Sequence, residues 1–373
     1  MNLRNFTTVQ LRKEALEKEL SVSLVAIGET LKDGEETIHC ENCIGAVSIP
    51  IGVAGPLQLS GEKVNRQVYA PLATTEGALV ASISRGCKAI TESGGATVLA
   101  YEIGTTRGPV FHTGSIQKSK ELFSWVKMNE EKMRAVAEST SSHLKYKKVT
   151  VKSIGAYVFM RFYFSTGEAM GMNMATIATQ KIIELIEAET GRPSLTVAGN
   201  YDIDKKPAWL NVINCRGKEA WAEAIISKEI VQTVLKTTPQ QIFDMWLAKC
   251  MLGSAMSGSM GFNCHFANVV AAFYLATGQD AAHVVEGSAG ITTTKVLENG
   301  DLYISVFMPA VMIGTVGGGT KLKTQTEARN IIGVSSSIEM AEVLVGAVLA
   351  GELSLLASLS EKTLAKAHRQ LGR

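Results

Sequence analysis

The sequence predicts an α+β protein in which a small unit is inserted into a larger domain. Two observations indicate this fold class. The pattern changes near Arg107-Gly108-Pro109, where a long amphipathic segment is followed by aromatic, β-prone segments. Apolar, glycine-broken helical segments then return after Asp204-Lys205-Lys206-Pro207. A helix–strand–strand–helix block between these two points is typical of a compact α+β unit.

Two helices are predicted before the insertion. Leu11–Leu20 places leucine and alanine on one face of a short charged helix. Ile44–Pro56 is a region punctuated by glycine and proline. Thr74–Ile90 is predicted to be a helix that Thr74 or Thr75 caps.

Within the insertion, Glu121–Leu144 is predicted to be a single helix, because its apolar residues recur at helical spacing. Val149–Val151 and Tyr157–Phe164 are rich in β-branched and aromatic residues and are predicted to be strands. A long helix is expected over about Met174–Thr190. The sequence contains no repeats and no low-complexity segment.

Composition and charge exclude several classes of protein. The chain has 373 residues, of which 46% are hydrophobic and 19% charged, so it can build a large core. The net charge of +2, from 37 basic and 35 acidic residues, does not favour a nucleic-acid or membrane-surface protein. No signal peptide is evident, and the apolar stretch Val343–Leu359 contains Glu352 and is shorter than the ~20 residues of a membrane span. We therefore expect a soluble cytoplasmic protein without a membrane or nucleic-acid partner.

The six cysteines fit that compartment. Cys87, Cys215, Cys250 and Cys264 lie in apolar or glycine-rich surroundings and are expected to be buried thiols. Cys40 and Cys43 form a C-x-x-C motif, which is half of a zinc site, a redox pair or an ordinary pair of thiols. Since no second pair follows at zinc-finger spacing, the ordinary pair is favoured.

Two glycine-rich segments are candidates for a phosphate-binding site. Gly167–Asn173 (GEAMGMN) lies between a predicted strand and a long helix, where backbone amides and the helix dipole favour an anion. It is not the G-x-G-x-x-G pattern, so an ordinary tight turn is an equally good interpretation. Gly314–Thr320 (GTVGGGT) leaves the same alternatives open, although three consecutive glycines favour close approach by a ligand or another subunit.

Five ionisable residues allow both a functional and an ordinary interpretation. Lys205 and Lys206, beside Asp204, are suited to stabilising an oxyanion or to lying in a solvated loop. Glu76 and Asp280 each lie near a predicted helix start, where a carboxylate can act as a proton donor or simply as a cap. His368 lies near the C-terminus, where a single histidine is usually a surface residue.

The local sequences around these positions resemble the 3-hydroxy-3-methylglutaryl-coenzyme A (HMG-CoA) reductase family, from about Glu41 to His368. The motifs that carry the resemblance are ENCIG (Glu41–Gly45), PIGVAGPL (Pro50–Leu57), ATTEGALVAS (Ala73–Ser82), TRGP (Thr106–Pro109), EAMGMN (Glu168–Asn173), GNYDIDKKPA (Gly199–Ala208), GQDAA (Gly278–Ala282), GTVGGGT (Gly314–Thr320) and AGELSLLA (Ala350–Ala357). The DKKP and GTVGGG versions are similar to the biosynthetic class of eukaryotes and archaea (class I), here without a membrane anchor.

The resemblance implies a reductive deacylation of HMG-CoA to mevalonate and CoA with two NADPH, in the mevalonate pathway of isoprenoid biosynthesis. Lys205 is implied to stabilise the oxyanion, Glu76 to donate a proton, Asp280 to tune both, and His368 to protonate the CoA thiolate. No metal is implied. An NAD-dependent reaction in the reverse direction and a non-catalytic CoA- or nucleotide-binding relative remain as alternatives.

The resemblance also implies the binding residues. Implied substrate contacts are Arg107, Asp204, Lys206, His265, Asn268, Leu355 and Leu359. Implied cofactor contacts are Ser141, Ser142, Glu168, Met170, Gly171, Met172, Asn173, Val316, Gly317, Gly318 and Arg373.

The implied architecture has three parts. Residues 1–40 form a helical N-terminal segment, and 41–109 with 198–373 form a large HMG-CoA domain around a long central helix. Residues 110–197 form an inserted, ferredoxin-like NADPH-binding domain. The family builds each active site from two subunits, so a homodimer is the expected minimum and a tetramer the alternative, with ENCIG and the three glycines near the interfaces.

Three departures from the family pattern concern binding. Ala198 stands where a substrate-binding serine is common, which removes a hydrogen bond worth ~1 kcal/mol. Glu168 replaces an aspartate, and Ser142 stands where an arginine commonly assists the NADPH 2′-phosphate. Lys145, Lys147 or Lys148 are candidate substitutes. NADPH is therefore the expected cofactor, with NADH as the alternative.

Overall fold

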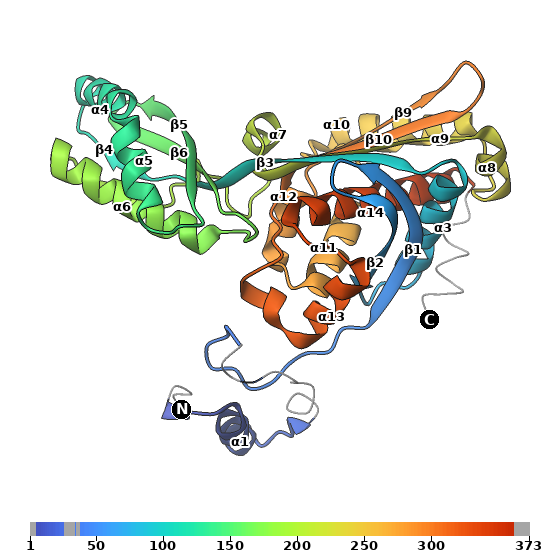
Figure 1. The fold of residues 1–373 in the computed structure, drawn as a ribbon, viewed down its shortest axis with the longest axis horizontal. Helices are drawn as coiled ribbons and strands as arrows, with labels where there is room; N and C mark the ends of the chain where they lie inside the picture. Colours follow the sequence, from blue (N-terminus) through green and yellow to red (C-terminus); the bar gives the residue numbers. More distant parts are fainter. Residues whose placement is uncertain (1–4, 26–33, 35–37, 362–373) are drawn as a thin grey trace.

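The α+β fold expected from the sequence is confirmed in a computed structural model, which describes residues 5–25, 34 and 38–361 (Figure 1). The chain forms a larger body around a long buried helix and a smaller helix-covered unit beside it (Figure 1). One long strand, β3 (Ala96–Arg107), runs between the two (Figure 1).

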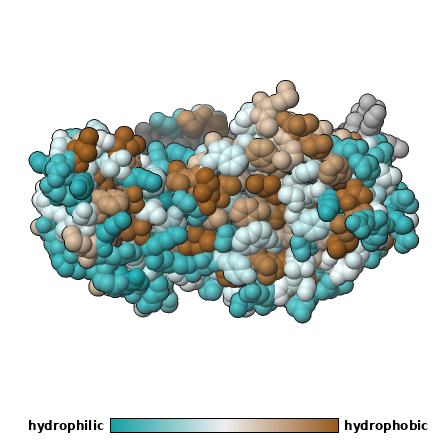
Figure 2. Space-filling model, turned by 90° about the horizontal axis from the view of Figure 1, so that it is seen from above, coloured by the Kyte–Doolittle hydropathy of each residue, from teal (hydrophilic) through white to brown (hydrophobic). Residues whose placement is uncertain are grey.

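The sheet of the larger body is mostly antiparallel. Strands β1 (Ile51–Gly61) and β2 (Asn65–Ala73) pair with each other, and the end of β1 runs parallel to β3. From β3 the order continues through β8 (Gly217–Ile226), β10 (Leu302–Val311) and β9 (Ile291–Val296), each pair antiparallel. One face of this part of the sheet packs on the central helix α14, and the other is open in Figure 2.

Helix α14 (Ser337–Ser360) is the centre of the larger core. Most of its residues are buried, and α3 (Leu79–Glu92), α11 (Phe266–Thr277) and the strands pack around it. It has 24 residues and contains an 18-residue window with a mean hydropathy of 1.9, so the expectation that this stretch is too short for a membrane span is wrong. Because 78% of the apolar window is buried inside the protein, the hydropathy reflects a core position.

The remaining helices of the larger body are short. They are α7 (Trp209–Asn214), α8 (Lys228–Thr233), α9 (Pro239–Trp246), the π-helix η3 (Leu247–Gly253), α10 (Ser254–Ser257), the 3-10 helix η4 (Ala281–His283), α12 (Val284–Gly287), the 3-10 helix η5 (Gly318–Lys321) and α13 (Lys323–Ile332). Three of them adjoin segments that the sequence analysis identified as candidate site segments. Helix α7 follows the Asp204–Pro207 segment, η4 follows Asp280, and η5 overlaps the glycine-rich segment Gly314–Thr320.

The smaller unit has its own sheet and its own buried core. Its elements are β4 (Val110–His112), α4 (Ile116–Met128), α5 (Glu130–Glu138), β5 (Lys145–Ile154), β6 (Tyr157–Ser165), α6 (Met172–Thr190) and β7 (Ser194–Thr196). Buried residues from Phe111 to Ile186 pack into a cluster separate from the larger core. The end of β3, Thr105–Arg107, pairs with β6 and so joins the two bodies.

Two predicted helices differ from the structure. The single helix expected over Glu121–Leu144 is two helices, because the chain turns at Asn129, which caps both. The helix expected from Thr74 begins only at Leu79, after Ala78 in a left-handed conformation without a side-chain cap. Thr74 accepts instead from the amide of Glu76 at 2.9 Å, which forms a local turn. The N-terminal helix is confirmed as α1 (Val9–Leu20).

The cysteines are all free thiols. Cys87, Cys215 and Cys250 are buried as expected, whereas Cys264 is only partly buried. Burial raises the pKa of the Cys87 thiol to about 12. Cys43 is also buried and Cys40 is exposed, so the two thiols of the C-x-x-C motif lie in different surroundings.

Candidate active site

A cavity of about 650 Å³ lies where the smaller unit meets the larger one. It brings together three segments that are far apart in the sequence: the start of α6, the loop at 204–205 and the glycine loop at 314–320. The predicted site residues that line it are Arg107, Met170, Gly171, Met172, Asn173, Asp204, Lys205, Asp280, Val316, Gly317 and Gly318.

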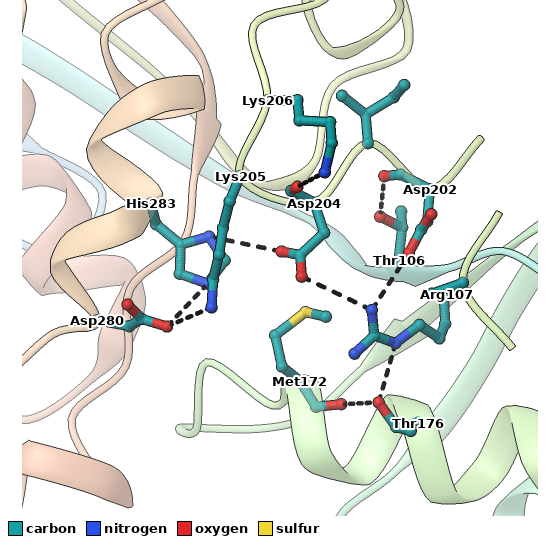
Figure 3. A network of polar contacts seen from close by, with 12 residues as sticks. Thr106, Arg107, Met172, Thr176, Asp202, Asp204, Lys205, Lys206, Asp280 and His283 are labelled. Carbon is teal, nitrogen blue, oxygen red and sulfur yellow. Dashed lines mark hydrogen bonds and ion pairs between the residues drawn. The ribbon is translucent and has the colours of Figure 1, made fainter. Parts of the chain in front are cut away.

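Lys205 and Asp280 form an ion pair on the wall of this cavity. The Nζ atom of Lys205 lies 2.7 Å from Oδ2 of Asp280 (Figure 3). Asp280 also caps η4, since its Oδ1 accepts from the amide of Ala282 at 3.1 Å. Although burial acts to raise it, the pKa of the Asp280 carboxyl is lowered by these two hydrogen bonds and by the nearby charges of His283 and Lys205. The pair is thus an ammonium beside a carboxylate.

The loop that carries Lys205 has an unusual backbone. Asn200, Ile203 and Lys205 have φ angles of 63°, 51° and 56°, a left-handed conformation that is costly for side chains with a Cβ. The amide of Lys205 donates to Oε1 of Glu286 at 3.3 Å, which helps to hold this conformation. Such strain is typical of segments that are held for function.

Arg107 lies between the loop and the smaller unit (Figure 3). Its Nε donates to Oγ1 of Thr176 on α6 at 2.9 Å, and one terminal nitrogen lies 3.3 Å from Asp202 and 3.6 Å from Asp204. Burial raises the pKa of the Asp202 carboxyl in spite of these cations. Arg107 therefore links the two bodies at the cavity, and its role towards a substrate stays a prediction.

A buried network behind the loop was not found from the sequence. Arg216 is fully buried and donates to Thr106 Oγ1 at 2.8 Å, to Asp204 Oδ1 at 3.0 Å and to Glu286. The only available signal was a charged pair, Arg216 and Lys218, at the entrance to an apolar strand. Lys218 donates to the carbonyl of Ile313, and burial lowers its pKa to about 8.

The start of α6 has the geometry of an anion site. Gly171 caps the helix in a left-handed conformation with φ 90° and has no capping side chain, so first-turn amides remain available. A Cβ at Gly171 would lie 2.2 Å from Oγ1 of Thr166, so only glycine fits. Across the cavity, Gly317 and Gly318 have positive φ angles and open space on their Cβ side. The donors and the shape suit a phosphate-containing cofactor such as a dinucleotide.

Glu168 lies outside the cavity that the predicted cofactor residues at 170–173 and 316–318 line. Its carboxylate accepts from the amide of Ser337 at the start of α14 and from Oγ1 of Thr315 at 3.4 Å. Its backbone carbonyl accepts from the amide of Thr315 at 2.8 Å. Glu168 therefore fixes the glycine loop against α6 and does not line the cavity.

Of the residues predicted to assist the 2′-phosphate, Ser141 contacts α6 and the three lysines lie on β5. Ser141 is close to the first turn of α6, with its Oγ 3.7 Å from the sulfur of Met174, whereas Ser142 is exposed. The candidate substitutes each have other partners: Lys145 pairs with Glu138, Lys147 donates to the Glu102 carbonyl, and Lys148 lies over the Tyr163 ring.

A second cavity, of about 630 Å³, holds other predicted residues. Asn268 and His265 line it, and Nδ2 of Asn268 donates to Oε2 of Glu76 at 2.5 Å. Glu76 is exposed in this chain. Lys249, to which the sequence pattern did not point, adds a cation to this lining. Leu355 and Leu359 are partly exposed on α14, one turn apart.

The predicted catalytic residues therefore fall into two groups. In the described part of the chain, neither Glu76 nor Asn268 forms a hydrogen bond or ion pair with Lys205 or Asp280. Lys206 is exposed beside the loop, and its Nζ lies 3.4 Å from the Asp204 carbonyl. His368 and Arg373 lie outside the described residues, so their predicted roles stay predictions.

Two groups of side chains have the atoms of a metal site. Cys250, Cys264 and Glu352 form one, with the two sulfurs 3.4 Å apart, and Asp204, His283 and Glu286 form the other. Glu352 already accepts from the amides of Cys264 and His265 and from Thr292. In the second group, the guanidinium of Arg216 lies among the carboxylates as their cation. The expectation of a metal-free reaction stays a prediction.

Comparison with known proteins identifies similar chains over nearly the full length. Residues 8–373 match the family described as Hydroxymethylglutaryl-coenzyme A reductase. The 3-hydroxy-3-methylglutaryl-coenzyme A reductase of Methanothermobacter thermautotrophicus is 47% identical, over 98% of this chain and 93% of that one. The reductase of Pyrococcus abyssi is 48% identical, over 98% of this chain and 92% of that one.

Solved structures match the fold at lower identity. A 3-hydroxy-3-methylglutaryl-coenzyme A reductase of Streptococcus pneumoniae has a TM-score of 0.73 and 17% identity, covering 96% of this chain and 99% of that one. A class II reductase of the same organism, bound to NADPH in open conformations, has a TM-score of 0.72 and 18% identity, covering 96% of this chain and 99% of that one. These structures support the fold.

Proposed function

This chain belongs to the hydroxymethylglutaryl-coenzyme A reductase family, and we propose on that premise that Lys205, Asp280 and Glu76 carry out its reaction. As a member of this family it is an oxidoreductase that converts HMG-CoA to mevalonate and CoA, a step of the mevalonate pathway. The observation that carries the residue assignment is the Lys205–Asp280 ion pair, which faces a glycine-lined cavity beside the bare N-terminus of α6.

NADPH fits that cavity. Its phosphates would accept from the first amides of α6, at Met172 and Asn173, and its backbone would lie against the open sides of Gly317 and Gly318. When bound, NADPH supplies the hydride for each of the two reduction steps. We therefore propose that the inserted domain, 110–197, binds the nucleotide together with the glycine loop at 314–320, and that 41–109 with 198–373 binds HMG-CoA.

Lys205 acts on the reacting carbonyl. Hydride addition to a thioester develops negative charge on the carbonyl oxygen, and a preorganised ammonium stabilises that charge more in the transition state than in the substrate. Asp280 holds Nζ in position from the opposite side. Glu76 donates a proton to the carbonyl oxygen in the aldehyde step, and His368 protonates the departing CoA thiolate.

The carboxylate of the substrate requires cations. Arg107 and Lys206 lie beside the Lys205 loop, and Lys249 lines the cavity of Glu76 and Asn268 together with His265. The side chains of Leu355 and Leu359 offer an apolar surface for the thioester region. Ala198 offers no side-chain hydrogen bond here.

A homodimer reconciles the two groups of catalytic residues. If Glu76, His265 and Asn268 of one subunit face Lys205 and Asp280 of another, one site is completed by two chains. The outer face of the β3, β8, β10 and β9 sheet is also available for subunit contact, as Figure 2 shows. Its apolar centre is built by Tyr101, Trp221 and Phe307, whose rings lie 5.3 to 5.8 Å apart in successive pairs. A tetramer is the alternative assembly.

The class and the compartment are inferred from motifs. The DKKP and GTVGGG segments favour the biosynthetic class, and relatives at 42–48% identity come from archaea and Dictyostelium discoideum. The buried position of α14 is that of a core helix, and we propose a cytoplasmic location for the enzyme.

The assignment is tested by NADPH oxidation with HMG-CoA, followed by the near-ultraviolet absorbance of the nicotinamide, beside NADH and beside Lys205→Ala. We expect two NADPH per CoA released and loss of turnover in the variant. Turnover with NAD and mevalonate only would instead favour the reverse direction. Undiminished activity of Lys205→Ala would overturn the residue assignment, and no activity in a folded wild type would favour a non-catalytic relative.

A further inference from the structure

We propose that His283, oriented by Glu286, is a positioning residue for the Lys205–Asp280 pair. The proposal rests on the roles assigned above to Lys205 and Asp280. It adds a histidine that the sequence pattern did not point to, although it lies in the same short segment as Asp280.

The position of the imidazole is unusual. His283 is fully buried, and its Nδ1 lies 2.7 Å from Oε1 of Glu286. Its Nε2 has no hydrogen-bond partner in the described structure and lies 3.8 Å from Oδ2 of Asp280 (Figure 3). A buried polar atom without a partner is costly, and this one faces the carboxylate that holds Lys205.

The spacing of the three residues explains their alignment. Asp280, His283 and Glu286 are three apart along η4 and α12, which places their side chains on one side of a helical segment. The result is a carboxylate, an imidazole and a second carboxylate in a row, with the ammonium of Lys205 at the exposed end.

Glu286 is the fixed end of this row. It is fully buried, pairs with Arg216 and accepts from the amide of Lys205. Because Arg216 is itself held by Thr106 and Asp204, the Glu286 carboxylate cannot turn away. In the imidazolium form, Nδ1–H donates to this carboxylate and sets the ring plane, and Nε2–H is directed at Asp280 as a second donor.

This arrangement matters when Lys205 acts. To stabilise an oxyanion, the ammonium must share its protons between the substrate and Asp280. The Asp280 carboxylate then loses part of its partner, and Nε2 of His283 is the nearest further group that can hydrogen-bond to it. His283 thus keeps Asp280, and through it Lys205, in the reactive geometry.

The charged groups around the ring fix the sign of the pH effect. The carboxylates are Asp280, Glu286 and Asp204, whose Oδ1 lies 3.9 Å from Nδ1 of His283. The cations are Arg216, which pairs with Glu286, and Lys205, which pairs with Asp280. Tyr274 of α11 faces Glu286. The charge of His283 helps to lower the pKa of the Asp280 carboxyl. Replacing the imidazole by an apolar group therefore raises that pKa, and the acid limb of the activity profile moves to higher pH.

The test compares His283→Leu, His283→Gln and Glu286→Gln, with Tyr274→Phe as a matched control. Tyr274 is buried beside the same network, and its hydroxyl forms no hydrogen bond with Asp280, His283 or Glu286, so its removal leaves the contacts among these three residues in place. For each variant, kcat, both KM values, the pH profile of kcat/KM and the melting temperature are measured with HMG-CoA and NADPH.

We expect His283→Leu to lower kcat by about 10- to 100-fold, the effect of losing a hydrogen bond to a charged group. The KM for NADPH stays within about threefold, the acid limb moves up, and His283→Gln restores part of kcat because its amide still donates. Tyr274→Phe leaves kcat and the profile unchanged. If His283→Leu does not fold, Glu286→Gln gives the same test.

The proposal is overturned by a His283→Leu enzyme with kcat within twofold of wild type. It is also overturned if kcat and melting temperature fall in Tyr274→Phe as much as in His283→Leu, with no movement of the acid limb. Failure of the proposed function has a different signature, since Lys205→Ala would then keep its activity whatever His283 does.

Discussion

The ammonium of Lys205 lies 2.7 Å from the carboxylate of Asp280, although the two residues come from separate segments of the chain. Lys205 is presented by a left-handed loop, and Asp280 by the cap of a short helix. Each is also held from behind, Lys205 through its amide and Asp280 through Ala282. The pair is therefore preorganised before any substrate arrives, which is the condition for efficient electrostatic stabilisation.

Asp280→Asn is expected to change stability in a pH-dependent way. The pKa of Asp280 is lowered in the folded protein, so its ionised form stabilises the fold above its unfolded-state pKa of about 3.9. This contribution is lost as the pH falls through the still lower folded-state pKa. Urea unfolding should show a constant difference between wild type and Asp280→Asn above about pH 5, which shrinks below about pH 4.

The matched control is Glu298→Gln, which removes an exposed carboxylate that forms no ion pair in the described structure. At each pH, the free energy of unfolding of Glu298→Gln should equal that of the wild type. A difference between wild type and Asp280→Asn that grows on acidification would contradict the lowered pKa.

The sequence predicted the residues of the site better than their arrangement. Lys205, Asp280, Gly171 and Gly318 were identified from local motifs, and all four line one cavity. Motifs report short stretches of chain, so they could not show that Glu76 lies with Asn268, apart from Lys205. That separation depends on how β3 and the surrounding loops bring distant segments together.

The same limit explains the missed residues. Arg216 and Glu286 are charged residues in apolar surroundings, and only their mutual contact and burial reveal a network. In the fold, the helix start at Leu79 was misplaced because Thr74 binds the amide of Glu76 in a turn. The break at Asn129 was missed because apolar periodicity continues on both sides of it.

Glu168→Ala is expected to weaken NADPH binding, although Glu168 does not line the proposed cofactor cavity. The Glu168 carboxylate joins the glycine loop, through Thr315, to the start of α14, through Ser337. Its loss should raise the KM for NADPH by about tenfold and lower the free energy of unfolding by about 1–2 kcal/mol. Ser336→Ala removes the side-chain cap of the same helix at Glu339 and should cost ~1 kcal/mol with an unchanged KM.

The pair of variants separates two explanations for Glu168. Should both raise the KM for NADPH equally, loosening of α14 would be the cause, and the link from Glu168 to the glycine loop would have no role of its own. Steady-state kinetics and thermal melting on the same preparations make this comparison.

Gly171→Ala is expected to damage the nucleotide site severely. The new Cβ would adopt an unfavourable positive φ and lie 2.2 Å from Thr166, so the loop before α6 must move. We expect a loss of about 2–4 kcal/mol in the free energy of unfolding. Gly155→Ala has φ 58° with nothing within 4 Å, so it should cost only about 1–2 kcal/mol and leave the kinetics unchanged. Equal melting temperatures for the two variants would refute the steric account.

Gly318→Ala addresses the other wall of the cavity. Gly318 has open space on its Cβ side and lines the cavity, so a methyl group there meets no protein atom. The left-handed backbone adds a cost of about 1–2 kcal/mol to folding. If the cofactor lies against this wall, its KM should rise several-fold while the KM for HMG-CoA stays constant. An unchanged KM for NADPH would place the cofactor elsewhere.

Mixing two inactive variants tests whether one site is built from two chains. Glu76→Ala and Lys205→Ala subunits are each expected to be inactive alone. If Glu76 of one subunit serves Lys205 of another, a mixed dimer regains one complete site. Random exchange of subunits then restores about a quarter of wild-type activity, because half of the dimers are mixed and each has one complete site of two.

The matched control mixes Lys205→Ala with Asp280→Asn. Lys205 and Asp280 form their ion pair within a single chain, so each site of a mixed dimer contains one substituted residue and neither site has a complete pair. This mixture should stay as inactive as its components. Activity is measured after denaturation and joint refolding, and the dimer content is checked by analytical ultracentrifugation. No recovery in the Glu76→Ala and Lys205→Ala mixture would mean that Glu76 and Lys205 of the same subunit act together, which would require a closing movement between the two cavities. Recovery in the control would contradict the pairing of Lys205 with Asp280 of its own chain.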